Sequence, residues 1–205
     1  MAAKRKRPCP PTPPTIHVAS LADRSEGRLH GVWLEATAGA DELRESIAQM
    51  LAASPISAAE KWAIIDVEGF HDIAIGAHES LAVVAELAAG IAVHGPAFAA
   101  WYCRFEPEPP ELAAEFLSAF RGEHWGAESY VWDLFGPAID EVYARTRSSS
   151  LSPYVDVDVT RLTQDLVARG EIVVIKAADH GQVWVFAGDG VAVRPDDDWD
   201  HWYRE

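Results

Sequence analysis

Cysteine is scarce in this chain of 205 residues, which contains only Cys9 and Cys103. Two cysteines without regular spacing supply neither a disulfide framework nor a zinc-binding pattern, so we expect the reducing environment of the cytoplasm. Long apolar runs are also lacking. The most apolar stretch, residues 81–102, is interrupted by Glu86 and by His94-Gly95-Pro96, which argues against a helix that crosses a membrane.

Basic side chains are few as well, and they are rarest where acids are most frequent. The whole chain has 32 acidic and 17 basic residues. Between Glu35 and Glu141, 19 carboxylates are accompanied by only four basic side chains, a surplus of 15 that equals the net negative charge of the chain. Affinity for a duplex comes mainly from Lys and Arg that displace its counterions. Direct binding of nucleic acid by this segment is therefore excluded, whereas a protein that normally holds nucleic acid is a suitable partner.

The first 15 residues have a basic start, Lys4-Arg5-Lys6-Arg7, but no hydrophobic segment of the kind found in secretory signals. Such a basic cluster is compatible with a targeting signal or a nucleic-acid patch. The five prolines that follow it favour instead a disordered leader over residues 1–15.

The N-terminal part has the pattern of a sheet with a helix packed on it. Alternating and β-branched segments predict strands over 16–21, 29–36 and 61–67, the first two joined as a hairpin. Asp41 predicts the cap of a helix that ends at Ser54-Pro55.

The middle of the chain predicts short helices with aromatic cores and acids on the outside. In one of them Leu112, Phe116 and Phe120 recur every four residues before Gly122. On caps and periodicity, the helices are expected over 80–94, 97–104, 112–122, 127–135 and 139–143.

The C-terminal part begins with residues 154–159, where Val alternates with Asp, a period compatible with a strand that has one solvated face. A helix over 159–169, ended by Gly170, and a hairpin of 171–176 with 182–187 follow. The tail from Gly188 has no clear period.

Candidate metal ligands are densest at Asp66, Glu68, His71 and Asp72. Alternate residues of a strand point the same way, so these side chains are compatible with a hard-cation or zinc site, and a metal-dependent hydrolase is one alternative. The spacing, however, matches neither an EF-hand nor an HExxH pattern, and the chain has no GxSxG motif and no phosphate-binding loop. We expect no catalysis, no cofactor and no metal.

The acids themselves suggest another function. Carboxylates one helical turn apart, such as Glu111 and Glu115, are separated by about 6 Å along the axis. One strand of a duplex carries a phosphate about every 3.4 Å, so outward acids on several short helices approximate the charge pattern of one face of DNA. Charge alone does not distinguish such mimicry from acidity that serves solubility.

Several segments in a fixed order resemble one family. The segment IHVASLADRSEGRLHGVWLEA, residues 16–36, is similar to the opening of ArdA-type antirestriction proteins, and WAIIDVEGF resembles their AIHDYEGF signature. The later segments LSPYVDVDVTRLTQDLVARGEIVVI and GQVWVF resemble their C-terminal block. The resemblance covers about residues 16–186. Ile65 and Val67 replace the His and Tyr of the signature, and the helices around 87–102 and 117–135 carry fewer acids than is usual. Mimicry by this chain is then either weaker than in the family or more dependent on the acids of 106–141.

The resemblance implies an elongated α+β protein of three small domains in a row. The corresponding ranges are a leader over 1–15, a sheet-plus-helix domain over 16–77, a helical middle domain over 78–112, an α+β domain over 113–187 and a tail over 188–205. It also implies a homodimer. The block from Ser148 to Val157 corresponds to the antirestriction motif near the dimer contact, whose residues here are Leu151, Tyr154, Val155 and Val157.

The function implied by the resemblance is mimicry of bent B-form DNA, which blocks the DNA-binding groove of type I restriction-modification enzymes. A module that binds another basic protein, such as a nucleoid or transcription factor, is the alternative. The carboxylates expected to contact the partner are Asp66, Glu68, Asp72, Glu79, Glu86, Glu106, Glu108, Glu111, Glu115, Glu123, Glu128, Asp133, Asp140 and Glu141.

Overall fold

The computed structural model describes residues 12–56, 59–177 and 181–188, so most of the predicted leader and tail lie outside the described residues. The chain divides into two compact units, the first ending at Phe116 and the second beginning at Leu117. Each unit contains one three-stranded sheet with helices, which confirms the α+β class. The predicted boundary at 77/78 falls inside the first unit, and the division into three domains stays a prediction.

The sheet of the first unit has β1 (Thr15–Ser20) at its centre, with β2 (Gly31–Glu35) and β3 (Trp62–Glu68) antiparallel on either side. Ile16 and Val18 are fully buried, whereas Thr15 and His17, which point to the other face, are only half-buried. The alternation that predicts these strands therefore also defines a core face and an outer face. The β1–β2 connection contains a short helix, α1 (Leu21–Ser25), in addition to the expected turn.

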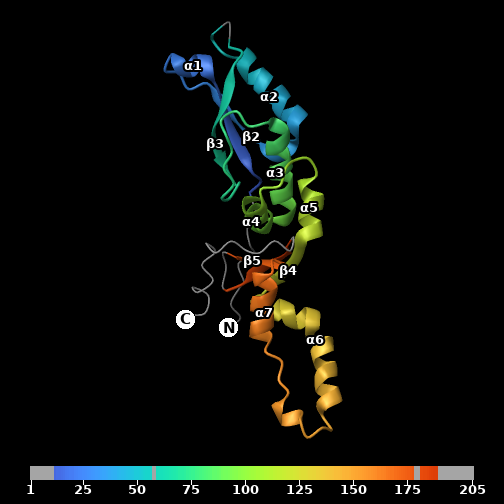
Figure 1. Cartoon of the computed structure of the whole chain (residues 1–205). Coiled ribbons are helices and arrows are strands. Elements are labelled where there is room, and N and C mark those ends of the chain that lie inside the picture. The colour runs from blue at the N-terminus through green and yellow to red at the C-terminus, as the bar shows by residue number, and fades with distance from the viewer. Residues whose placement is uncertain (1–11, 57–58, 178–180, 189–205) are drawn as a thin grey trace, which may run out of the picture. The chain divides into compact units, whose positions relative to one another are not determined.

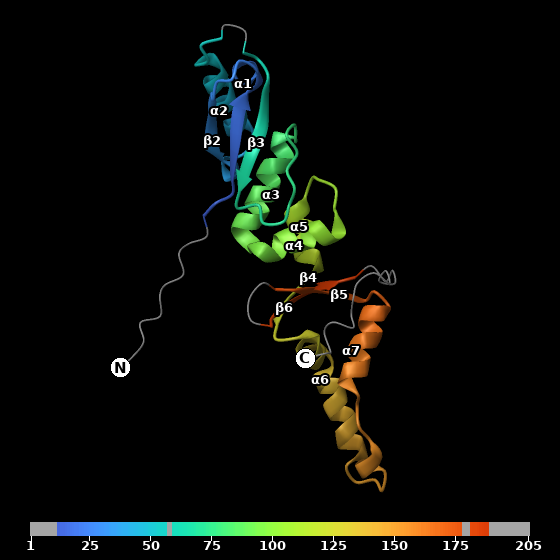
Figure 2. The same ribbon diagram turned by 90° about the vertical axis from the view of Figure 1, so that its left-hand side faces the viewer.

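The described helices that pack on this sheet lie on its core face. The helix α2 (Ala40–Ala52) follows a 3-10 turn at Ala36–Ala38 and buries Leu43, Ile47 and Met50. Its cap is Gly39, with φ of 97°, and not Asp41, which lies in the first turn. Figures 1 and 2 show α2 on one side of the sheet, with the opposite face of the strands left uncovered by helices.

Three further helices complete the first unit around an aromatic core. They are α3 (Leu81–His94), α4 (Pro96–Phe105) and α5 (Leu112–Ala119), which runs across the division between the units. The rings of Phe98, Trp101 and Phe116 lie 5.4–5.5 Å apart between centroids. Gly90 permits this packing, because a Cβ there would lie 2.3 Å from the Phe98 ring. The sharp turn between α3 and α4 occurs at Gly95, as the sequence predicts.

The second unit packs two helices on a sheet of order β4-β6-β5. Its strands are β4 (Phe120–His124), β5 (Ile172–Lys176) and β6 (Val183–Ala187), and the last two form the predicted hairpin. The helices α6 (Ala127–Thr146) and α7 (Val159–Ala168) lie side by side (Figure 2), joined by a segment that contains a 3-10 turn at Ser152–Tyr154.

Two predicted helix ends are wrong, although the helices themselves form. Residues 120–124 form β4 because Phe120 pairs with Phe186 and His124 with Val183, partners about 60 residues away that local periodicity does not reveal. The helix α6 continues through Gly136 and Pro137 instead of ending there. A proline inside a helix removes a hydrogen bond, but here Val131 and Ile139 on either side are buried in one core, which offsets that loss.

The predicted strand over 154–159 does not form either. Asp156 accepts a hydrogen bond from the Tyr143 hydroxyl at 3.0 Å, and Asp158 caps α7 by accepting from the Arg161 amide at 2.8 Å. The alternation of Val and Asp thus reflects two side-chain hydrogen bonds and the half-buried Val157 between them, and not a pleated strand.

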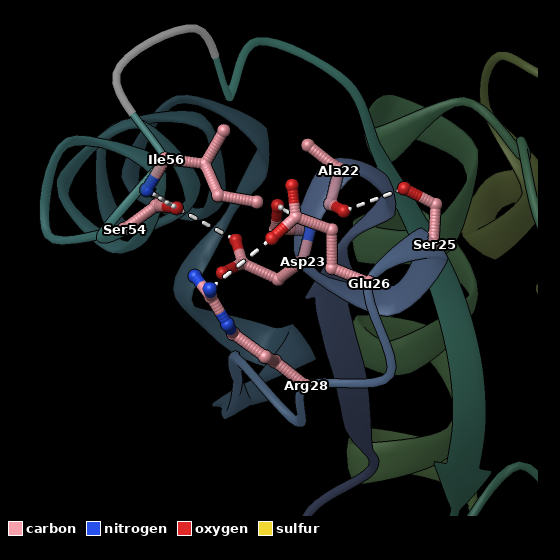
Figure 3. Close-up of polar contacts among 8 residues, drawn as sticks. Ala22, Asp23, Ser25, Glu26, Arg28, Ser54 and Ile56 are labelled. Carbon is pink, nitrogen blue, oxygen red and sulfur yellow. Dashed lines mark hydrogen bonds and ion pairs between the residues drawn. The ribbon is translucent and has the colours of Figure 1, made fainter.

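A buried carboxylate ties the β1–β2 connection to the end of α2. Asp23 is fully buried in α1, and its Oδ2 accepts a hydrogen bond of 2.6 Å from the Ser54 hydroxyl. Ser54 in turn accepts from the Ile56 amide (Figure 3). The Ser54 hydrogen bond lowers the pKa of the Asp23 carboxyl below its ordinary value of 3.8; it outweighs burial, which acts in the opposite direction, while Ser20, His30 and Arg28 lower the pKa further.

This contact predicts a pH-dependent stability. Because the folded-state pKa of Asp23 lies below the unfolded one, its contribution is complete above the ordinary pKa and is lost as the pH falls through the folded value. The substitution Ser54→Ala should therefore destabilise the protein more at pH 6 than at pH 3 in urea unfolding. Val93→Ala, at an exposed apolar position of α3 in the same unit, is the control that should show no such pH dependence. If Ser54→Ala lowered the free energy of unfolding equally at both pH values, the charge-assisted contact would be contradicted.

Candidate partner-binding surface

The acidic surplus is concentrated in the first unit. Its described residues, 12–56 and 59–116, hold 16 acidic and five basic side chains, whereas those of the second unit hold nine and six. Eleven of the 14 carboxylates predicted to contact a partner are exposed, and Glu79, Glu86 and Glu128 are half-buried. A cationic surface that approaches the first unit therefore meets a strong attractive field.

The outer face of the first sheet brings together acids from two edge strands. Thr15 at the centre is paired with Glu35 on one side and with Glu68 on the other, and His17 is paired with Asp66. Asp66 and Glu68 are exposed and two residues apart, an advance of about 6.7 Å along the strand. This equals the rise of about two phosphates on one strand of a duplex. Glu35, which was not among the predicted contacts, joins this group through the strand register alone.

A second group of acids surrounds the end of α4, although its members are far apart in the sequence. Burial is the largest cause that raises the pKa of the Tyr102 hydroxyl, and the charges of Glu79 and Glu106 raise it further. Burial likewise raises the pKa of the Cys103 thiol above its ordinary value of 9.0, with Asp72 and Glu106 adding to the effect. Asp72, Glu79 and Glu106 thus act on the same small area of surface.

The segment between α4 and α5 displays three exposed acids on a constrained backbone. Glu106 and Glu111 have positive φ values of 47° and 82°, which residues other than glycine rarely adopt. Glu108 lies between them. Glu86, in contrast, makes a contact within the first unit: its Oε1 accepts a hydrogen bond of 2.7 Å from the Leu112 amide at the start of α5. Glu115 is exposed on the first turn of α5.

In the second unit several predicted contact acids have partners within the unit. The Trp184 indole donates to Glu123 Oε2 at 3.1 Å, and Asp133 lies 3.5 Å from His124. Glu141 forms an ion pair with Arg145 one turn along α6. Asp140 is exposed on the same helix, seven residues from Asp133, so both project from similar directions. The contact role of these acids stays a prediction.

The residues predicted for the dimer contact differ in exposure. Tyr154 is 83% and Leu151 60% exposed, so both are accessible on the segment between α6 and α7. Val157 packs against the core of its own unit, and Val155 is half-buried. Two large apolar side chains of α6, Leu134 and Val142, add to the exposed apolar surface of this unit.

The alternative of a metal site at Asp66, Glu68, His71 and Asp72 gains no support. Within the described parts of the chain, no three His, Cys, Asp or Glu side chains are grouped so that they could hold a metal ion. His71 has a positive φ of 53° in the turn after β3, which leads it away from the regular alternation of the strand. Among the described helices, none is long and apolar enough to cross a membrane.

Comparison with known proteins assigns the family. A family model described as antirestriction protein (ArdA) matches residues 16–179, which is most of the chain. The chain therefore belongs to the ArdA antirestriction protein family, as its ordered sequence segments predict. A search of curated proteins found no match. A search of solved structures also found none.

The acidic group around α4 predicts the behaviour of Cys103. Because Asp72 and Glu106 disfavour the thiolate, Glu106→Gln should lower the pKa of the Cys103 thiol and speed its reaction with a thiol reagent at neutral pH. The measurement requires a Cys9→Ser background. Glu45→Gln on α2 is the control and should leave the rate unchanged. Added salt should accelerate the reaction of the parent chain more than that of Glu106→Gln, because salt screens the charge of Glu106. Equal acceleration of both proteins would contradict the electrostatic cause.

Proposed function

We propose that this ArdA-family protein inhibits type I restriction-modification enzymes by occupying their DNA-binding groove as a mimic of B-form DNA. The observation that carries the proposal is the concentration of exposed carboxylates on the first unit, with few basic side chains among them. Membership of an antirestriction family supports a restriction enzyme as the target. The proposed action is binding in the cytoplasm and involves no catalysis, cofactor or metal.

The arrangement of the acids supports mimicry beyond net charge. The pair on β3 advances about 6.7 Å, and the acids of the 106–111 segment are presented by a backbone with two left-handed residues. Carboxylates held in place by a scaffold lose less conformational freedom on binding than acids on a flexible tail. Lys and Arg of a groove that normally contacts phosphates would then pair with carboxylates instead.

The direct test is restriction of unmodified DNA by a type I enzyme in the presence of increasing amounts of the protein. We expect inhibition at low salt that weakens as salt is added, because the contacts are between charges. A short DNA duplex should displace the protein from the enzyme, since both would occupy the same groove. Complete restriction at micromolar protein in low salt, or binding that an excess of duplex leaves unchanged, would refute the proposal.

Neutralising acids of the outer sheet face should weaken inhibition. The triple variant Glu35→Gln, Asp66→Asn, Glu68→Gln removes the three charges of this face, and we expect about a tenfold higher concentration for half-inhibition, from exposed pairs worth about 0.2–1 kcal/mol each. The control neutralises Glu42, Glu45 and Glu60, three exposed acids of the same unit outside the predicted contacts. Equal effects of the two triple variants would show that net charge, and not position, determines inhibition.

We also propose that the protein acts as a homodimer through the second unit. Exposed Leu151 and Tyr154, together with Leu134 and Val142 on α6, are apolar surface that a second copy would remove from water. Tyr154→Asp should convert the dimer into a monomer, measured by light scattering after size-exclusion chromatography. Leu29→Asp, at a fully exposed position in the first unit, is the control. A Tyr154→Asp protein that remains dimeric would exclude this contact.

A further inference from the structure

None of the described helices packs on the outer face of the first sheet, and the two ends of this face differ in charge. At one end Glu35 and Glu68 flank Thr15, with Asp66 beside His17. At the other end Arg24 and Arg28 line a cavity of about 260 Å³ together with His17, Ala19, Leu29, His30, Gly31 and Ile65. At the α1 end Asp23 and Glu26 balance the two arginines, and Arg28 lies 3.1 Å from Glu26, so a bound cationic segment is attracted to the Thr15 end.

The chain enters the sheet at the acidic end. The Pro14 carbonyl accepts a hydrogen bond of 2.9 Å from the Ala36 amide, directly after Glu35. On the other side, a Cβ on Gly69 would lie 3.1 Å from the Pro14 Cα, directly after Glu68. Pro14 is buried. The residues that precede β1 therefore start from a fixed point between the ends of the two edge strands that carry these acids.

We propose that the basic segment Lys4–Arg7 binds the acidic end of this face and competes there with a basic partner. Charge complementarity favours this occupant, since four consecutive basic residues precede β1 in the sequence, and strand pairing places three carboxylates beside the start of β1. The length of the connection agrees. A proline-rich segment extends by about 3.1 Å per residue, so the six steps from Arg7 to Pro13 reach at most about 19 Å. The carboxylates of Glu35, Asp66 and Glu68 lie within about 10 Å of Thr15 by strand spacing and rise.

The contact is strengthened because the basic segment is covalently attached close to the acidic end of the sheet. A short linker holds the segment at an effective concentration on the order of millimolar near its site, so individually weak ion pairs are populated at low salt. A partner with a higher density of Lys and Arg displaces the segment, and a weakly basic surface does not. The segment thereby raises the charge density that a partner needs. This regulatory role rests on the proposed function, whereas the contact itself does not.

Zero-length carbodiimide cross-linking of the full chain, followed by mass spectrometry, tests the contact. The Lys4 and Lys6 amines should couple to Glu35, Asp66 or Glu68 within one chain, and the yield should fall with added salt. A mixture of isotope-labelled and unlabelled protein distinguishes coupling within a chain from coupling between copies. Coupling only to other acids, only between copies, or with a yield independent of salt would overturn the contact.

Competition with a cationic probe tests the consequence. Neutralising Lys4, Arg5, Lys6 and Arg7 to Gln should tighten binding of a short polylysine peptide by on the order of threefold at low salt. The matched control changes Arg145, Arg147, Arg161 and Arg169 to Gln, which removes the same charge from the second unit. Equal tightening in both variants would overturn the competition. If intrachain coupling occurs and type I restriction is not inhibited, the proposed function fails while the contact stands.

Discussion

The first unit depends on the position of β1 at the centre of its sheet. Ile16 and Val18 are fully buried against the helices on one face. On the other face Thr15 pairs with Glu35 and Glu68, and His17 pairs with Trp33 and Asp66. Because side chains alternate between the two faces from Thr15 to Val18, burial of the apolar pair turns the polar pair outward. The same alternation that builds the core therefore places Glu35, Asp66 and Glu68 on one open surface.

Concentrating negative charge on one small unit has a cost in self-repulsion, and the fold offsets it by local contacts. Glu86 caps α5 through the Leu112 amide, and the aromatic rings of Phe98, Trp101 and Phe116 form a dense core between the helices. The buried Asp23 contributes in its charged form because Ser54 donates to it. Packing and these hydrogen bonds stabilise the unit, so the exposed acids remain available for a cationic partner. Burial is the main cause that raises the pKa values of Tyr102 and Cys103 at the end of α4, and the nearby acids add to it.

The second unit carries less net charge and more exposed apolar surface, which suggests a different role. Its core includes Val131 and Ile139 on both sides of Pro137, so that α6 continues as one helix to the segment with Leu151 and Tyr154. Acids and apolar contacts are thus divided between the two units: the first suits recognition by charge, and the second suits association of two copies. The ArdA family match covers residues of both.

Local chemistry in the sequence determined the strands β1, β2, β3, β5 and β6, most helix ends, the acidic segment from Glu35 to Glu141 and, through ordered motifs, the family. These features depend on neighbours within a few residues, such as the alternation around Ile16 or the turn at Gly95. Tertiary structure alone decided that residues 120–124 pair with β6, that α6 passes through Pro137, and that Asp156 and Asp158 serve as hydrogen-bond acceptors instead of belonging to a strand. It also decided which acids share a surface. Glu35 and Glu68 lie on either side of Thr15 in the sheet, and Asp72, Glu79 and Glu106 act on the end of α4. The physical reason is that charge is visible residue by residue, whereas the direction and proximity of side chains follow from contacts between segments far apart in the chain.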